Sequence, residues 1–459
     1  MLHDGLAPVP EFLSARAAEI QKNAYIDKSY YDKYDVKRGL RNKDGTGVTA
    51  GLTRVGDVRG YYMQDGKRIP APGSLSYRGI DVSELIAGFV SEGRFGFEET
   101  AYLLLFGSLP DAPELCGFGR IIAEYRELPE GFTEDMIMAA PSIDIMNKLA
   151  RSVLAMYSYD PEPETDRRDI ARELDRAMRI IARSPVVAAN AFSAKRHYYD
   201  GDSLYIHKPQ AGLSTAENFL YSVRHDHSFT RDEAGILDLC LVLHAEHGGG
   251  NNSCFACRLL SSSGTDIYSV IAAALGALKG PRHGGASAYA GEMLSCIREG
   301  VRDTRDDDEI AFMLRRILRG DAGRGDGLIY GMGHAVYTLS DPRAVELKKM
   351  AGALAEKKGV TPEYEFVCAV ERIAKDVFAE RDGGKKAMCA NVDMYSGFVY
   401  NMLGIPRELH IPLFAVSRMV GWCAHHIEEV VNAGKMIRPA YKAISPEAGY
   451  VALDRRGGV

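Results

Sequence analysis

Along most of the chain, apolar residues recur every three or four positions, which is the spacing of an amphipathic helix. The segment 97–107 starts with acidic residues and ends at a glycine, as helix macrodipole and C-capping preferences favour. Thr230-Arg231-Asp232-Glu233 has the form of a capping box, and the helix that it opens is expected to end at the glycines 248–250. Helices are predicted at residues 11–25, 97–107, 141–157, 165–194, 216–220, 230–247, 266–278, 309–319, 343–356, 364–380 and 411–433.

One stretch departs from the helical pattern. Val58, Tyr61 and Met63 precede the turn sequence Asp65-Gly66, and apolar residues at 69 and 75 follow it. This arrangement is typical of a β-hairpin and is the only convincing β signal in the chain. The sequence therefore predicts an all-α, mainly helical fold with a small N-terminal β-hairpin.

Composition narrows the class of protein. The chain has 459 residues, enough for two or three domains or for one large domain with a smaller one attached. Its 46% hydrophobic and 26% charged residues are typical of a soluble globular protein. The net charge of -6 is spread without blocks, which argues against nucleic acid and anionic membranes as partners. Without a membrane-spanning run or a targeting signal, we expect a cytoplasmic protein.

Four segments place polar side chains beside glycines, where the backbone can approach a ligand closely. Their polar residues are His244 and His247, His283, His334 with Arg343, and Asp393. His334 can donate a hydrogen bond to a developing oxyanion, and Arg343 can clamp a carboxylate through two parallel hydrogen bonds. Structural interpretations stay open: the histidines can satisfy backbone carbonyls, and Asp393 can cap a helix that starts near residue 395.

Arg418 is a candidate of another kind, because it lies among apolar residues of a predicted helix. A charge in such surroundings needs an anionic partner or a route to water. Snorkelling of the side chain off the helix surface is the structural alternative.

A metal site is the competing hypothesis. His244-x2-His247 and Cys254-x2-Cys257 offer four ligands at zinc-like spacings, so a structural zinc site or a zinc hydrolase is an alternative. Against it, Phe255 and Ala256 make the cysteine pair look like one side of an apolar helix. The eight cysteines do not form a disulfide framework. A helical binding scaffold without catalysis is disfavoured by the number of polar groups beside glycines.

Taken together and in order, these segments resemble the motifs of the citrate synthase family. They are the segments 244–249, 280–285, 331–343 and 391–397, and the segments 77–81 and 97–107 look like the family's N-terminal signatures. The resemblance covers residues 55–439. It implies a two-domain, nearly all-α dimer, with a large domain at 1–285 that includes an N-terminal extension at 1–54. The small domain is expected at 286–404, with C-terminal helices at 405–459 returning to the large domain.

The resemblance implies condensation of a short acyl-CoA with oxaloacetate, followed by thioester hydrolysis, as in the tricarboxylic acid cycle. Asp393 would be the base, His283 the donor to the thioester oxygen and His334 the group that polarises the ketone of oxaloacetate. The expected oxaloacetate ligands are His247, Arg343, Arg418 and Arg438, the last of them reaching into the neighbouring subunit's site. The expected CoA contacts are Ile329, Tyr330, Gly331 and Gly333. No metal or other cofactor is expected.

Two points stay open. Members of the family often carry Lys or Arg where Thr338 stands, in a position that can meet a CoA phosphate; Arg324, Arg315 or Lys279 can compensate. The motifs also do not show whether the thioester is acetyl-CoA or propionyl-CoA, because one methylene changes the free energy of discrimination by only ~1–3 kcal/mol. They therefore do not distinguish a citrate synthase from a 2-methylcitrate synthase.

Overall fold

The structure is a computed structural model that describes residues 17, 21–163, 168–383, 387–432 and 434–456. Contacts divide it into two compact units, one of Leu52–Ile437 and one that joins Met1–Gly51 to Arg438–Val459. Most of the helix predicted at 11–25 lies outside the described residues, although residues 21–24 are helical. The domain boundaries expected at residues 285 and 404 remain predictions.

The predicted β-hairpin is confirmed. Strands β1 (Gly56–Gln64) and β2 (Lys67–Tyr77) pair antiparallel, and the short β3 (Ile80–Asp81) pairs with the end of β2. Asp65 and Gly66 both have positive φ, at 50° and 72°, as a two-residue hairpin turn of this kind requires. The pairing shifts register between Arg59 and Tyr61.

Helices make up most of the rest, so the mainly helical fold class is confirmed. The larger unit contains α3 (Val82–Ser91), α4 (Phe97–Phe106), α5 (Ala112–Tyr125), α6 (Ile145–Ala155), α7 (Ile170–Lys195), α8 (Thr215–Val223), α9 (Arg231–His244), α10 (Asn252–Ser261), α11 (Ile267–Lys279), α12 (Ala286–Gly300), α13 (Asp307–Arg319), α14 (Pro342–Lys358), α15 (Thr361–Asp382), α16 (Val392–Met402) and α17 (His410–Asn432). The shorter turns η2 (Thr133–Met138), η3 (Met156–Tyr159), η4 (Arg196–Asp200) and η5 (Arg407–Leu409) connect them, and the other unit has α2 (Ser29–Lys33), η1 (Arg38–Leu40) and η6 (Leu453–Arg455). The capping box at Thr230 and the glycine C-cap at Gly107 form as predicted.

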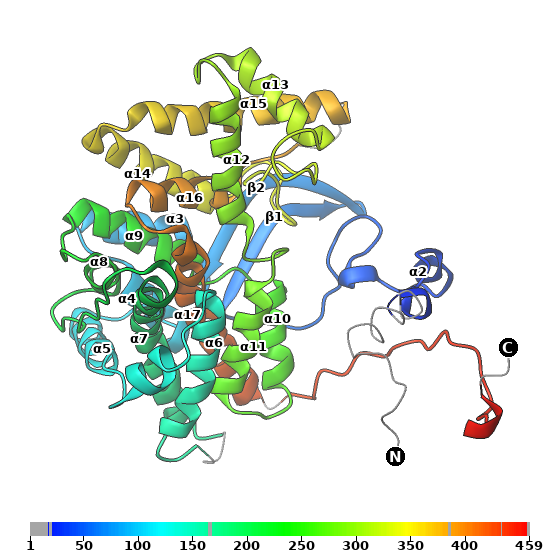
Figure 1. The fold of residues 1–459 in the computed structure, drawn as a ribbon, viewed down its shortest axis with the longest axis horizontal. Helices are drawn as coiled ribbons and strands as arrows, with labels where there is room; N and C mark the ends of the chain where they lie inside the picture. The colour runs from blue at the N-terminus through cyan, green and yellow to red at the C-terminus, as the bar shows by residue number, and fades with distance from the viewer. Residues whose placement is uncertain (1–16, 18–20, 164–167, 384–386, 433, 457–459) are drawn as a thin grey trace. The chain divides into compact units, whose positions relative to one another are not determined.

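Helix α17 is central to the core of the larger unit. It is buried from His410 almost to its end, and α6, α7, α9, α10 and α11 pack around it (Figure 1). Helices α12 to α16 pack mainly on one another, while α14 and α16 also contact α9. Except for Arg438, the residues that the sequence singles out therefore come from elements that meet near α9, α14, α16 and α17. None of the helices in the described part of the chain combines the length and the hydropathy of a bilayer-spanning segment.

Candidate active site

His247 follows the end of helix α9 instead of lying in its last turn. The helix ends at His244 because other elements bind its last carbonyls. The Tyr77 hydroxyl donates to the Val242 carbonyl (2.9 Å), and Nε of Arg418 donates to the His244 carbonyl (2.6 Å). The prediction that both histidines share one helical turn is therefore wrong.

Both of these histidines are buried and neutral. Burial lowers the pKa of His244 and of His247 well below the ordinary value, and the charge of Arg343 lowers each further. Neither ring nitrogen of His244, nor Nε2 of His247, has a hydrogen-bond partner among the described residues. Since buried polar atoms normally find a partner, these nitrogens are suited to receive a ligand.

His283 lies in the loop between α11 and α12, and its proton position is defined. Its Nε2 accepts a hydrogen bond from the main-chain N–H of Ser253 (3.3 Å) and lies 2.8 Å from the Ser253 hydroxyl. A nitrogen that accepts bears no proton, so the proton of the neutral ring is on Nδ1. Burial, helped by the charge of Arg418, lowers the pKa of His283 to about 4. His283 is therefore a neutral hydrogen-bond donor at Nδ1.

His334 has the opposite proton position. Its Nδ1 accepts hydrogen bonds from the main-chain N–H groups of Val336 (3.1 Å) and Tyr337 (3.2 Å), so the neutral ring carries its proton on Nε2. The ring stacks on Tyr337, with centroids 4.7 Å apart. It also meets the ring of His247 nearly at right angles, with centroids 4.9 Å apart. The segment around His334 thus presents an N–H donor beside His247.

The segment around His334 is joined to the start of α16. The main-chain N–H of Asn391 donates to the Gly331 carbonyl (2.9 Å), and its side-chain amide donates to the Gly333 carbonyl (2.8 Å). Gly331 has a φ of 80°, and a Cβ there would lie 3.0 Å from Cα of Met394. Only glycine fits this crossing without strain.

Asp393 is the second residue of α16 and does not cap it. The cap is Asn391, whose side chain accepts a hydrogen bond from the main-chain N–H of Asp393 (3.0 Å). The structural alternative for Asp393 is therefore wrong. Burial raises the pKa of Asp393 to about 6, although the nearby Arg343 acts in the opposite direction. Such a carboxylate is a stronger base than an ordinary aspartate and is still ionised at neutral pH.

Arg343 and Arg418 are both buried. Arg343 donates to the Asp341 carboxylate through Nε (3.0 Å) and Nη2 (2.7 Å). The guanidinium of Arg418 lies 4.8 Å from the centre of the Phe414 ring, and its Nη2 has no partner among the described residues. Arg418 does not snorkel to the surface, so that alternative is wrong. A buried guanidinium with an unsatisfied N–H is costly unless an anion binds it.

The charges of the two arginines reach the other candidate residues. Arg418 contributes to the pKa shifts of His247, His283 and Asp393, and Arg343 to those of His247 and Asp393. Direct contacts join members of this group as well, because the His247 ring lies against the His334 ring and Arg418 donates to the His244 carbonyl. Arg438 lies in the other compact unit and is exposed, and its role at a neighbouring site remains a prediction.

The predicted CoA contacts form the start of the segment that contains His334. They are Ile329, Tyr330, Gly331 and Gly333. Ile329 and Gly331 are buried, and the Tyr330 hydroxyl donates to the Asp326 carboxylate (2.6 Å). Their role in binding a nucleotide remains a prediction.

The four residues of the zinc alternative do not converge. Within the described ranges, the only His, Cys, Asp and Glu side chains that bring three ligand atoms within 4.8 Å of one another are Glu246, Cys254 and His425. His425 Nε2 is hydrogen-bonded to Glu246 (3.1 Å), and its Nδ1 accepts from Arg258 (2.8 Å). A site built on His244, His247, Cys254 and Cys257 is therefore ruled out by the geometry.

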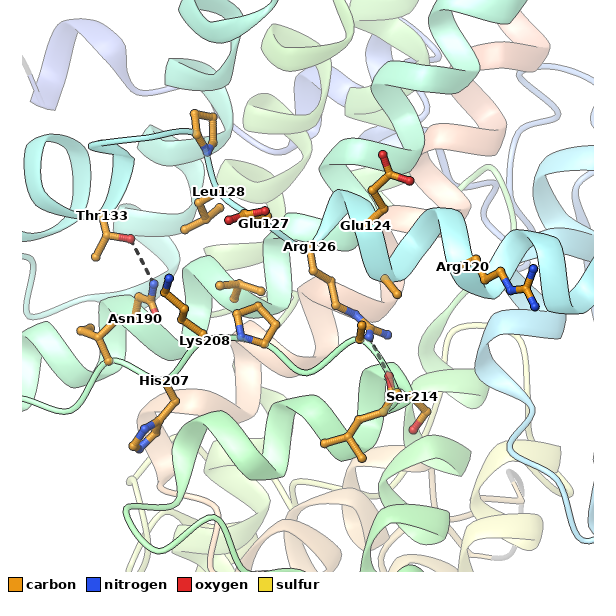
Figure 2. A pocket seen from close by; sticks show the side chains of 18 of the residues that line it. Arg120, Glu124, Arg126, Glu127, Leu128, Thr133, Asn190, His207, Lys208 and Ser214 are labelled. Carbon is orange, nitrogen blue, oxygen red and sulfur yellow. Dashed lines mark hydrogen bonds between the residues drawn. The ribbon is translucent and has the colours of Figure 1, made fainter.

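A cavity of about 1070 Å³ lies apart from this group of residues. Figure 2 shows Arg120, Arg126, Asn190, His207 and Lys208 in its wall, and none of the residues that the sequence predicted as site residues lines it. Arg126 is satisfied by the Leu213 carbonyl and the Thr215 hydroxyl, and Asn190 by the Thr133 hydroxyl. The size of this cavity alone therefore does not make it the reaction site.

Sequence reasoning missed several residues that orient the candidate groups. Asp341 and Asn391 are the N-caps of α14 and α16, and a cap residue just before a predicted helix was the signal that could have found them. The contacts of Ser253 and Tyr77 gave no local signal, because their partners lie 30 and 165 residues away along the chain, although Tyr77 belongs to the segment 77–81 that the sequence singled out.

Comparisons with known proteins agree with the motifs. The family model described as "Citrate synthase, C-terminal domain" matches residues 44–440. The chain is similar to the citrate synthase of Haloferax volcanii, with 35% identity over 80% of this chain and 88% of that protein. It is also similar to the citrate synthase of Synechocystis sp., with 33% identity over 90% and 94%.

Solved structures give the same result. The fold is similar to that of citrate synthase from Thermoplasma acidophilum in a ternary complex with carboxymethyl coenzyme A and oxaloacetate, with a TM-score of 0.74 and 28% identity over 92% of this chain and 99% of that one. Citrate synthase from Thermotoga maritima gives a TM-score of 0.70 and 30% identity over 92% and 100%.

Proposed function

The chain belongs to the citrate synthase family, and from this premise we propose that it condenses acetyl-CoA with oxaloacetate and hydrolyses the citryl-CoA thioester to citrate and CoA. One combination of groups in the larger unit supports the proposal: a carboxylate of raised pKa, two neutral histidines of defined proton position and two buried arginines. This combination suits the ionisation of a carbon acid next to a bound dicarboxylate.

The first step is removal of a proton from the methyl group of acetyl-CoA. Asp393 accepts this proton, but a carboxylate alone is far too weak a base for an unassisted methyl group. The Nδ1–H of His283 therefore donates to the thioester oxygen, which becomes the enol or enolate oxygen as the C–H bond breaks. Because Nε2 of His283 accepts from the main-chain N–H of Ser253, the N–H of the neutral ring is on Nδ1 and can serve this oxygen.

The second step forms the carbon–carbon bond. Arg343, Arg418 and Arg438 of the partner subunit bind the two carboxylates of oxaloacetate, and His247 adds a hydrogen bond. The Nε2–H of His334 polarises the ketone and protonates the oxygen as it becomes an alkoxide. The ring then regains a proton from solvent, and Asp393 releases to solvent the proton that it took from the methyl group, so the step is balanced. Water then hydrolyses the thioester. The backbone of residues 329–333 forms the wall for the adenine end of CoA.

The functional unit in this proposal is a homodimer, because each site needs Arg438 from the other chain. Closure of the region 286–404 over the remainder would exclude water from the enolate. No metal or organic cofactor takes part, and the protein works in the cytoplasm.

The second candidate function is that of a 2-methylcitrate synthase, which uses propionyl-CoA. It is favoured by the 32% identity of the chain to 2-methylcitrate synthase 1 of Corynebacterium glutamicum over 86% of this chain. Measurement of kcat/KM for both thioesters separates the two. We expect acetyl-CoA to be preferred about tenfold or more, which is the discrimination that one methylene allows. A preference for propionyl-CoA would establish the second function, and release of CoA from neither would refute the proposal.

A further inference from the structure

A basic side chain lies beside the predicted adenine wall. A cavity of about 220 Å³ is lined by Tyr330, which belongs to that wall, and by Leu328, which directly precedes it. Arg324 lines the same cavity and is its one basic residue in the described part of the chain. Its side chain is 41% exposed, so the guanidinium can reach a ligand that enters from solvent.

The guanidinium of Arg324 lies over an aromatic ring. It lies 3.8 Å from the centre of the Tyr289 ring, and that ring lies 5.1 Å from the ring of Tyr330. Stacking on an aromatic face leaves the edge of a guanidinium available for hydrogen bonds, and this edge matches two oxygens of a phosphate.

The present ionic partner of Arg324 is shared. Nη1 of Arg324 donates to Glu292 (3.0 Å), and Arg407 binds the other oxygen of the same carboxylate. Asp326 lies farther away, 3.8 Å from Nε of Arg324, and accepts the Tyr330 hydroxyl. If Arg324 turns to another anion, Glu292 keeps Arg407 and Asp326 keeps the Tyr330 hydroxyl, so both carboxylates retain a partner. Exposed ion pairs of this type are weak and readily exchanged.

The other basic residues that could replace the missing side chain at position 338 lie elsewhere. Arg315 is paired with Glu380 (2.9 Å), and Lys279 with Asp144 (2.7 Å). Neither lines the cavity beside Tyr330.

We propose that Arg324 binds a phosphate of the CoA nucleotide and so supplies the positive charge that Thr338 lacks. This inference rests on the proposed function and names one contact of its thioester substrate. The contact is made to the nucleotide end of CoA, remote from the reacting methyl group, so it contributes to binding and not to the chemical step.

The test compares Arg324→Ala with the matched control Arg298→Ala. Arg298 is also an exposed arginine with one carboxylate partner, Glu363 at 3.1 Å. Loss of a charge-assisted phosphate contact raises KM for acetyl-CoA by about tenfold or more in Arg324→Ala. The kcat and the KM for oxaloacetate stay within about twofold of wild type, and Arg298→Ala behaves as wild type. An unchanged KM for acetyl-CoA in Arg324→Ala would overturn the inference.

Truncated thioesters identify the phosphate. With acetyl-dephospho-CoA, which lacks the 3′-phosphate, the difference between wild type and Arg324→Ala disappears if Arg324 binds that phosphate. If the difference persists with acetyl-dephospho-CoA but disappears with S-acetylpantetheine, which lacks all the phosphates, Arg324 binds the diphosphate. A difference that persists with S-acetylpantetheine would show that Arg324 acts on the reacting end, contrary to the inference.

Calorimetric titration of CoA into the wild type and into Arg324→Ala distinguishes a failure of this inference from a failure of the proposed function. If the wild type turned over no thioester, the proposed function would be refuted, and the inference would still be judged by binding alone. Weaker CoA binding in Arg324→Ala by about tenfold supports it, and equal binding refutes it.

Discussion

At the level of single residues, the chemistry depends on which nitrogen of each histidine bears the proton. Main-chain N–H groups fix this at both rings, because Ser253 donates to Nε2 of His283 and Val336 to Nδ1 of His334. A histidine held in this way presents its remaining N–H in one direction without a change of tautomer. The motifs indicated which residue types matter, but they carried no information about these donors, since the partner of His283 is distant in the sequence.

The Ser253 hydroxyl supports His283 and is open to a direct test. Removal of the hydroxyl in Ser253→Ala leaves the main-chain donor but loosens the ring, so kcat is expected to fall about five- to thirtyfold. The KM for oxaloacetate should stay unchanged, because that substrate contacts other residues in the proposed mechanism. Steady-state kinetics measures both. Equal kcat values for the variant and the wild type would show that the hydroxyl does not position His283.

The raised pKa of Asp393 predicts the pH profile. The base must be ionised, and its pKa is about 6, so kcat/KM should fall as the pH drops through about 6, tenfold for each further pH unit. His283, with a pKa of about 4, stays neutral throughout that range and adds no second limb above pH 5. An acid limb centred near pH 4 would contradict a base in this buried environment. The profile is best measured with thioester concentrations well below KM.

Among the secondary-structure elements, the β-hairpin has a role that the sequence did not indicate. The pattern around Asp65-Gly66 predicted the two strands correctly, because a two-residue turn is a local signal. It could not indicate that the hairpin packs against the segment of His334, since these contacts join residues more than 260 positions apart: Arg68 donates to the Val336 carbonyl (3.1 Å), and Gly73 donates to the Ser340 hydroxyl (3.0 Å). The end of α9 was mispredicted for the same reason.

A substitution at Gly60 tests the contact between the β-hairpin and the segment that contains His334. A Cβ at this position would lie 2.6 Å from the Val336 carbonyl oxygen and 3.0 Å from Cα of Tyr337, both backbone atoms. Gly60→Ala should therefore move the residues that donate to His334, lower kcat about tenfold or more, and destabilise the protein by about 1–3 kcal/mol. Gly88→Ala in α3 is the control, because its added Cβ would meet nothing within 4 Å apart from the backbone of its own helix and its chain neighbours, and it should raise stability by about 0.4–1 kcal/mol. Wild-type kcat in Gly60→Ala would show that the hairpin does not support the site.

At the level of the whole molecule, the order of the motifs along the chain predicted the family, which no single motif could do. Helix type, the hairpin and the family could be predicted because helical periodicity, turn chemistry and glycine-flanked segments are local features. The way in which α17 places Arg418 beside α9 could not, because it depends on packing between distant helices. The role of Arg438 is a further prediction of this kind, since it concerns a second copy of the chain.

Hybrid dimers test the role of Arg438. Asp393→Asn and Arg438→Ala homodimers should both be nearly inactive. In a hybrid of the two, one site has Asp393 of one chain and Arg438 of the other, so one site of two works. Random mixing makes half the dimers hybrid, and activity should recover to about a quarter of the wild-type value. Recovery to no more than a few per cent, despite hybrids seen by differential tagging, would refute an arginine shared between subunits.

The decisive experiment is the condensation itself, measured for the wild type and Asp393→Asn with acetyl-CoA and oxaloacetate, together with calorimetric binding of oxaloacetate. The wild type should form citrate and CoA in equal amounts. Asp393→Asn should bind oxaloacetate nearly as well and lose about 10²–10⁴-fold in kcat, because the group that accepts the methyl proton is gone. If Asp393→Asn kept most of its turnover, the carboxylate would not be the base and the mechanism built around it would be wrong.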